Sequence, residues 1–106
     1  YLIILKSIYL IKKQNSDHFK IGFAQNAKKR LKELQTGSSE SLELIDSFQT
    51  NNYAQIEAML HRNFSYCRLS GEWFEFKNNE QATFESCCLL YEKNLSLVAD
   101  FKSYKR

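Results

Sequence analysis

The sequence predicts an α+β fold in which a small, three-stranded, mostly antiparallel sheet is flanked by helices. Short runs rich in Ile, Leu, Phe and Tyr favour strands near the start and in the middle of the chain. Three other segments repeat apolar residues at the spacing of amphipathic helices. The length of 106 residues and the hydrophobic share of 43% match one domain with a single core.

The domain is expected to span residues 1–106, with residues 100–106 as a polar tail that frays. The chain begins at Tyr1 rather than Met, which is compatible with excision from a longer protein. Its apolar start is broken by Lys6 and Ser7 and is too short to cross a bilayer. We therefore expect no membrane partner, while the oligomeric state stays open.

The three cysteines form no Cys-x-x-Cys pair, and two of them are adjacent: Cys67, Cys87 and Cys88. Neighbouring cysteines rarely form a structural disulfide, and zinc sites favour paired spacings. Small buried thiols in a reducing interior are therefore expected. This predicts an intracellular location, cytoplasmic or nuclear.

The first two strands are predicted to form a hairpin. Residues 1–12 are rich in strand-forming residues, and residues 7–11 are the best-formed part. There Ile8 and Leu10 point to one face, and Tyr9 points to the other. Polar residues 13–17 supply the turn, and residues 18–22 return antiparallel to the first strand.

A basic helix is predicted next. Gly22 permits a sharp exit from the strand, Asn26 suits an N-cap, and Gly37 supplies the stop. The apolar positions recur at helical spacing: Ala27, Leu31 and Leu34. Arg30 is expected at the shoulder of this stripe, aimed over the sheet. Three lysines share the exposed side, where a solvated basic face is the simplest interpretation: Lys28, Lys29 and Lys32.

The remaining elements are a strand over residues 42–48, two more helices, and a brief strand or extended segment over residues 71–76 that closes over the sheet. The second helix is expected to start near Asn51 or Asn52, with Glu57 and His61 at the border of its core stripe. The third helix is expected to follow a cap at residue 78 or 79. Its core stripe is Phe84, Cys87, Cys88, Tyr91 and Leu95.

Charge is distributed unevenly, although the net charge is only +3. Residues 1–32 hold eight basic residues and one acid, whereas residues 33–61 hold five acids and no Lys or Arg. A basic first third suits a polyanion partner, and acids in the middle suit a cation. Mixed charge that serves solubility alone is the alternative.

The order and spacing of several short motifs resemble the GIY-YIG nuclease superfamily. A Ser-Ile-Tyr strand at residues 7–9 precedes Gly22, Asn26 and Arg30, which match the second motif of that superfamily. Glu-x-x-Leu-His at residues 57–61 and Gly-Glu-Trp-Phe at residues 71–74 are similar to marks of one branch. That branch holds the phage T5 open-reading-frame type and the meiotically up-regulated gene type.

The resemblance implies a divalent-metal-dependent endonuclease that hydrolyses phosphodiesters, with DNA as the substrate and RNA as the alternative. Tyr9 would activate or orient water, Arg30 would offset the charge of the transition state, and Glu57 would hold Mg²⁺ or Mn²⁺. A cation nearby would be needed to lower the phenol pKa of Tyr9. His61 is a candidate second ligand or proton donor, with structural hydrogen bonding as the alternative.

Two departures from the motifs matter. Ser7 replaces the Gly of the first motif, and Lys20 stands where the second motif has Tyr. Lys20 would then contact phosphate, together with the helix lysines. The alternatives are a nucleic-acid-binding module that does not cut, and a protein-interaction domain that uses the surface of Trp73 and Phe74. Each site residue also has a plain structural interpretation, and only their joint order favours catalysis.

Overall fold

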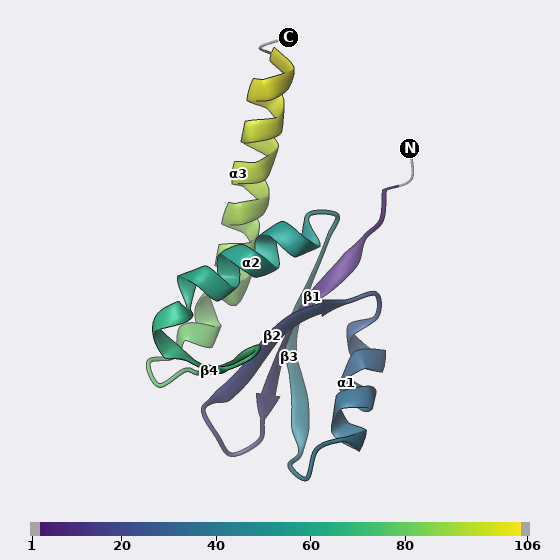
Figure 1. Cartoon of the computed structure of the whole chain (residues 1–106), viewed down its shortest axis with the longest axis vertical. Coiled ribbons are helices and arrows are strands. Elements are labelled where there is room, and N and C mark those ends of the chain that lie inside the picture. Colours follow the sequence, from purple (N-terminus) through teal and green to yellow (C-terminus); the bar gives the residue numbers. More distant parts are fainter. Residues whose placement is uncertain (1–2, 105–106) are drawn as a thin grey trace.

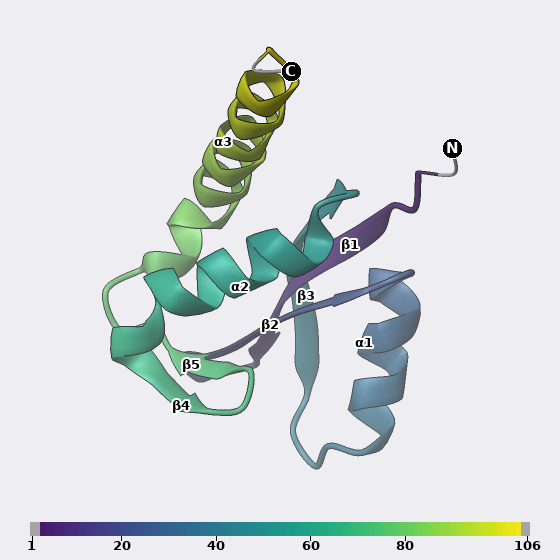
Figure 2. The ribbon, with the colours of Figure 1, turned by 45° about the horizontal axis from the view of Figure 1, so that its top comes forward.

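The computed structural model describes residues 3–104, with side chains described as far as Ala99. In this part of the chain five strands form one sheet, with helices on both of its faces (Figures 1 and 2). The elements in chain order are β1 (Lys6–Lys13), β2 (His18–Ala24), α1 (Ala27–Thr36), β3 (Leu42–Thr50), α2 (Tyr53–Asn63), β4 (Arg68–Ser70), β5 (Trp73–Glu75) and α3 (Phe84–Tyr104). Short 3₁₀ turns follow α2, at Ser65–Cys67, and precede α3, at Glu80–Thr83.

The prediction of a three-stranded sheet is wrong, because the strand order is β3-β1-β2-β5-β4. All four neighbouring pairs are antiparallel. The three expected strands are present, and β4 and β5 add a hairpin on the outer edge of β2. Strand β5 lies within residues 71–76, where the sequence predicts a brief strand or extended segment, but its place in the sheet was not predicted. Strand β4 has three residues, which is too few for an alternating pattern to show in the sequence. Strand β1 begins at Lys6, later than expected, and residues 1–2 lie outside the described part.

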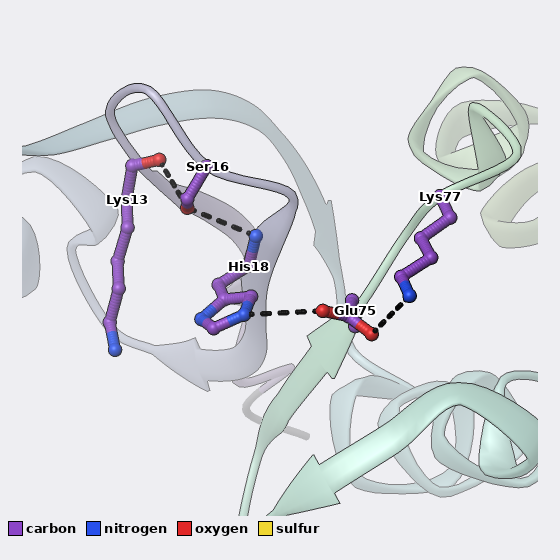
Figure 3. Close-up of polar contacts among 5 residues, drawn as sticks. All are labelled: Lys13, Ser16, His18, Glu75 and Lys77. Carbon is purple, nitrogen blue, oxygen red and sulfur yellow. Dashed lines mark hydrogen bonds and ion pairs between the residues drawn. The ribbon is translucent and has the colours of Figure 1, made fainter.

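The turn between β1 and β2 is closed by one serine. The Ser16 hydroxyl donates a hydrogen bond to the carbonyl of Lys13 at 2.8 Å and accepts one from the amide of His18 at 3.1 Å (Figure 3). His18 lies opposite Glu75 in the β2–β5 ladder, where the two side chains are 3.6 Å apart. Lys77 contacts the other oxygen of that carboxylate at 3.4 Å. This turn fixes the register that brings Tyr9 opposite Gly22.

The two faces of the sheet carry different cores because strand side chains alternate. The larger core lies between the sheet, α2 and α3, and includes Ile8, Leu10, Phe19, Ile21, Ile56, Leu60, Phe74, Phe84 and Cys88. The smaller core lies under α1 and includes Tyr9, Ile11 and Ala27. Helices α1 and α2 therefore cover opposite faces, as Figure 2 shows.

Helix α3 carries the expected core stripe in its first half. Phe84 and Cys88 are buried, and Cys87, Tyr91 and Leu95 pack against them. The helix continues through Tyr104 and projects away from the sheet (Figure 1), where the sequence suggested a frayed tail from residue 100. Residues 105–106 of that tail lie outside the described residues. None of the helices within residues 3–104 has the length and apolar character needed to cross a membrane.

Candidate active site

Gly22 lies at the centre of a cluster of polar side chains. It is buried on β2, directly opposite Tyr9 on β1. A Cβ atom at this position would lie 2.6 Å from Cζ of Tyr9 and 2.9 Å from Oε1 of Glu72. Real Cβ atoms do not approach other heavy atoms so closely, so only glycine leaves room for these two side chains. The phenol and the carboxylate therefore share the space above Gly22.

Arg30 reaches this space from α1. The helix is started by Asn26, whose side chain accepts a hydrogen bond from the amide of Lys29 at 3.1 Å, as the sequence predicts. One turn into the helix, the Arg30 guanidinium contacts the Tyr9 phenol, and this contact raises the pKa of the guanidinium. Arg30 also pairs with Glu33 at 3.6 Å. A permanently charged group is thus held beside Tyr9.

The surroundings of Tyr9 shift the pKa of its phenol upward. Burial raises the pKa of its phenol above 10.0, the charges of Glu72 and Glu57 add to that rise, and the contact with Arg30 offsets part of it. The residue exposes 2% of its surface. Without a metal ion the phenol therefore keeps its proton at neutral pH and supports Arg30, and its expected role in activating or orienting water stays a prediction.

Three potential metal ligands meet on the other side of the β2 edge. Glu57 and His61 lie one turn apart on α2, and Glu72 lies in the turn between β4 and β5. One ligand atom from each lies within 4.8 Å of the other two. Buried Ile56 and Leu60 form the adjacent stripe of α2 and so hold this edge of the helix at the cluster.

The backbone of Ile21 holds two of these residues in place. Its amide donates a hydrogen bond to the carbonyl of Glu72 at 3.1 Å, and its carbonyl lies 2.9 Å from Nε2 of His61. A carbonyl only accepts hydrogen bonds, so Nε2 carries the proton, and in the neutral imidazole Nδ1 has the lone pair. The rings of His61 and Phe74 are perpendicular, with 5.0 Å between their centroids. This contact fixes the plane of the imidazole.

The electrostatics of the cluster favour a cation. Burial raises the pKa of Glu57 above 4.5, and repulsion from Glu72 raises it further. The charges of His61 and Lys20 lower it in part. Two carboxylates that repel each other in a half-buried site are a common arrangement where a positive ion is to be held.

The donor set fits a small divalent cation. Oxygen ligands of Mg²⁺ lie about 2.0–2.1 Å from the ion, so two of them stand at most about 4.2 Å apart. The three ligand atoms lie within 4.8 Å of one another, and the side chain of Glu72, which is 38% exposed, has room to adjust toward the other two. Two carboxylates suit Mg²⁺ or Mn²⁺, and the imidazole extends the choice toward transition metals.

Lys20 also belongs to the cluster. Its ammonium lies 3.2 Å from Oε1 of Glu72, and its side chain is only 13% exposed. The expected contact of Lys20 with phosphate stays a prediction, because the ammonium is paired with a carboxylate of the site.

A concave surface adjoins Arg30 at the start of α1. Its volume is about 470 Å³, and its lining includes Asn26, Lys29 and Arg30. Lys28 and Lys32 are exposed on the same helix but do not line this cavity. Neither Tyr9 nor Glu57 lines it, so the cluster meets the open surface here through Arg30.

Glu72 is the functional candidate that sequence reasoning missed. The motif Gly71-Glu72-Trp73-Phe74 was recognised, but its acid was assigned to organising the segment rather than to the site. The structure brings Tyr9, Arg30 and Lys20 together with Glu57 and His61, and adds Glu72 to them. The useful signal was an acid placed directly after a glycine turn.

Comparison with known proteins gives one match. Searches among curated proteins and among solved structures each found no match. The family model of the T5orf172 domain matches residues 6–87, which include every residue of the cluster. That family is associated with GIY-YIG-like, nuclease-type domains. The chain therefore belongs to the T5orf172 domain family.

Proposed function

We propose that this chain is a divalent-metal-dependent endonuclease that nicks or cuts DNA. The observation that carries the proposal is the meeting, at Gly22, of a phenol–guanidinium pair with a set of potential metal ligands. Tyr9 and Arg30 approach from the α1 face, and Glu57, His61 and Glu72 approach around the edge of β2. Membership of a family associated with nuclease-type domains supports the same conclusion.

Hydrolysis of a phosphodiester needs positive charge where negative charge grows on phosphorus. Arg30 supplies a planar guanidinium that matches two phosphate oxygens and stays charged at any working pH. Its contact with Tyr9 and its pairing with Glu33 hold this group at the rim of the 470 Å³ cavity. The scissile phosphate would bind at the cluster, between Arg30 at the rim of that cavity and the potential metal ligands.

Glu57 and Glu72 would hold the metal ion. A bound Mg²⁺ or Mn²⁺ supplies Lewis-acid activation of the phosphate and of water. His61 faces the same space and has its Nε2 proton engaged with the carbonyl of Ile21. With the ion held by the two carboxylates alone, the lone pair on Nδ1 would be free to accept a proton from the attacking water, instead of binding the metal. Tyr9, which contacts the Arg30 guanidinium, would orient that group or a phosphate oxygen.

The basic surface of α1 would position the nucleic acid. Lys29 lines the cavity beside Arg30, and Lys28 and Lys32 extend positive charge along the exposed side of the helix. Contacts between these side chains and backbone phosphates carry no sequence preference. They would make binding weaken steeply as salt concentration rises.

One observation favours a second function, a nucleic-acid-binding module that does not cut. The Lys20 ammonium pairs with Glu72 at 3.2 Å, and it thereby supplies a positive charge where the metal would bind. If that pairing persists when divalent ions are present, the site holds phosphate without activating water. Binding would then survive while hydrolysis is lost.

Nicking of supercoiled plasmid separates the two functions. The chain, purified in EDTA, is incubated with plasmid and Mg²⁺ or Mn²⁺, and the open-circle product is measured. We expect nicking only with the divalent ion, and a loss of about 100-fold or more in Glu57→Gln and in Arg30→Lys.

The matched control is Glu43→Gln, because Glu43 is an exposed acid on β3, outside the cluster. This variant should nick at the wild-type rate. Circular dichroism establishes that each variant is folded. A wild-type chain that binds plasmid but leaves it supercoiled with either ion would overturn the nuclease proposal and favour the binding module.

A further inference from the structure

A second hollow lies on the α1 face of the sheet, next to the cluster. Its volume is about 350 Å³, and it is bounded by the end of β1, the loop after α1, and β5. Trp73, Lys13 and Lys20 form one part of its wall, and Leu34, Ser38 and Ser39 form another. Pockets that bind small ligands start at about 300 Å³. The hollow therefore has room for one nucleotide but not for a paired duplex.

Trp73 gives this hollow an aromatic wall. It lies opposite Lys20 in the β2–β5 ladder, so its side chain stands on the same face as Lys20. The neighbouring Phe74 points into the larger core and is fully buried. Trp73 is only half-buried, although it is the largest side chain type in proteins. Such a ring at the wall of a polar hollow is a stacking platform for a base.

Two ammonium groups flank the indole. Nζ of Lys13 lies 4.5 Å from the ring centroid, and Nζ of Lys20 lies 5.4 Å from it. Lys20 is neutralised by Glu72, but no carboxylate among the described side chains pairs with Lys13. In Figure 3 the ammonium of Lys13 likewise takes no part in the ion pairs around Glu75. The Lys13 ammonium lies over the indole without a carboxylate partner, so it can leave the ring for the phosphate of a nucleotide whose base then takes its place on the ring.

The opposite wall suits a base better than a second phosphate. It is formed by the carboxyl end of α1 and the loop that follows, where the helix dipole is negative. The carboxylate residue Glu40 lies there too, beside the hydroxyls of Ser38 and Ser39. These groups accept hydrogen bonds, as the exocyclic amino groups of bases require.

We infer that this hollow binds one unpaired nucleotide of the DNA, with its base stacked on Trp73 and its phosphate at Lys13. The inference rests on the proposed function, because Lys20 joins the hollow to the cluster that would hold the scissile phosphate. It makes the substrate a DNA with an unpaired or extruded nucleotide beside the cut, rather than a continuous duplex.

The single tryptophan of the chain reports directly on this site. Its fluorescence is measured in EDTA, where no metal-dependent cutting occurs, while three DNAs of equal length are added: a single strand, a duplex with one bulged nucleotide, and a fully paired duplex. Anisotropy of labelled DNA measures binding in parallel. The single strand and the bulged duplex should quench the fluorescence at saturation, and the paired duplex should bind without quenching it.

Variants test the two walls. Trp73→Ala should weaken binding of the bulged duplex by about tenfold and leave the paired duplex unaffected. Trp73→Phe keeps a ring and should retain most of the affinity. Lys13→Ala should weaken binding of the bulged duplex more than Lys77→Ala, since Lys77 is an exposed lysine that pairs with Glu75 away from the hollow.

The inference fails if the paired duplex quenches as strongly as the bulged one, or if no DNA quenches at saturation. The wild-type fluorescence decides this even if Trp73→Ala does not fold. Failure of the proposed nuclease would look different, because quenching would persist while plasmid stays uncut in Mg²⁺ and Mn²⁺. If the chain cuts plasmid but its fluorescence is not quenched selectively, the nucleotide pocket is wrong and the nuclease proposal stands.

Discussion

Gly22 and Tyr9 face each other across the β1–β2 ladder, and the absence of a side chain at Gly22 lets the phenol lie close to Glu72. The glycine is required for space rather than for an unusual backbone angle. Arg30 then depends on Tyr9 for its position. The close approach of the phenol and the carboxylate thus follows from one missing Cβ atom.

Replacing this glycine tests that dependence. In Gly22→Ala the new methyl would stand 2.6 Å from Cζ of Tyr9, so the phenol or the strand must shift. We expect the free energy of unfolding to fall by about 1–3 kcal/mol, as in other overpacked cores. Nicking should fall with it. Urea denaturation and the plasmid assay measure the two effects.

Gly37→Ala is the matched control, because its Cβ would meet nothing closer than 3.9 Å and its φ is −92°. That variant should unfold and nick as the wild type does. Equal stability of Gly22→Ala and the wild type would show that the space at Gly22 is not needed.

The ionisation of Glu57 makes the stability of the fold depend on pH. Its pKa is raised above 4.5 by burial and by Glu72, so the folded state holds its proton more tightly than the unfolded state. Stability from this group is therefore full below pH 4.5 and is lost as the pH rises through the folded value. In EDTA, Glu57→Gln should melt like the wild type at acidic pH and at a higher temperature at neutral pH.

Thermal melts across pH, with and without Mn²⁺, check this expectation. Because a ligand that binds only the folded state stabilises it, Mn²⁺ should raise the melting temperature of the wild type at neutral pH. It should raise that of Glu57→Gln much less. A melting temperature of Glu57→Gln below that of the wild type at neutral pH in EDTA would contradict the account.

Sequence reasoning succeeded best for residues that sit on regular elements. Arg30, Glu57 and His61 could be placed at the shoulders of amphipathic stripes, because helical spacing alone defines those shoulders. Glu72 lies in a turn, where no periodicity shows which way a side chain points. Its contacts with Ile21 and Lys20 depend on a strand pairing that only the three-dimensional structure supplies.

The β4–β5 hairpin is the element that completes the site. It pairs with β2 only as far as Lys20. Beyond that point the backbone of β2 forms hydrogen bonds with Glu72 and His61 instead. Gly71 opens its turn with a φ of +55°, a left-handed angle that side chains other than Asn and Asp rarely adopt. The conformation of Gly71 therefore sets the position of Glu72.

Gly71→Ala should disturb that position. Nothing lies within 4 Å of the new Cβ, so the effect is one of backbone conformation alone, costing about 1–2 kcal/mol. We expect a matching fall in the free energy of unfolding and weaker binding of Mn²⁺, measured by calorimetry. Gly71→Asn is the control, since Asn tolerates the left-handed region. The two variants behaving alike would argue against this role.

Long elements were predicted from the sequence more completely than short ones. The hairpin of β1 and β2, the cap and stop of α1, and the stripes of α2 and α3 each leave a pattern of eight residues or so. Strand β4 consists of three exposed residues, Arg68–Ser70, and it leaves none. Its place in the sheet follows from long-range pairing with β5 rather than from local preference.

The molecule as a whole brings chemistry together from both faces of one sheet. Helix α1 delivers Arg30 on one face, and α2 delivers Glu57 and His61 on the other. They meet around β2 because its edge is free beyond the short β5 pairing. Two polar hollows, of about 470 and 350 Å³, lie on the α1 side of this meeting point. The arrangement suits a DNA strand that crosses the α1 face.

The most direct test of this account is plasmid nicking in Mn²⁺ by Glu72→Gln, because the structure alone brings Glu72 to Glu57 and His61. We predict a folded chain that binds plasmid as the wild type does and has lost nicking to the same extent as Glu57→Gln. Nicking at the wild-type rate by Glu72→Gln would contradict the account.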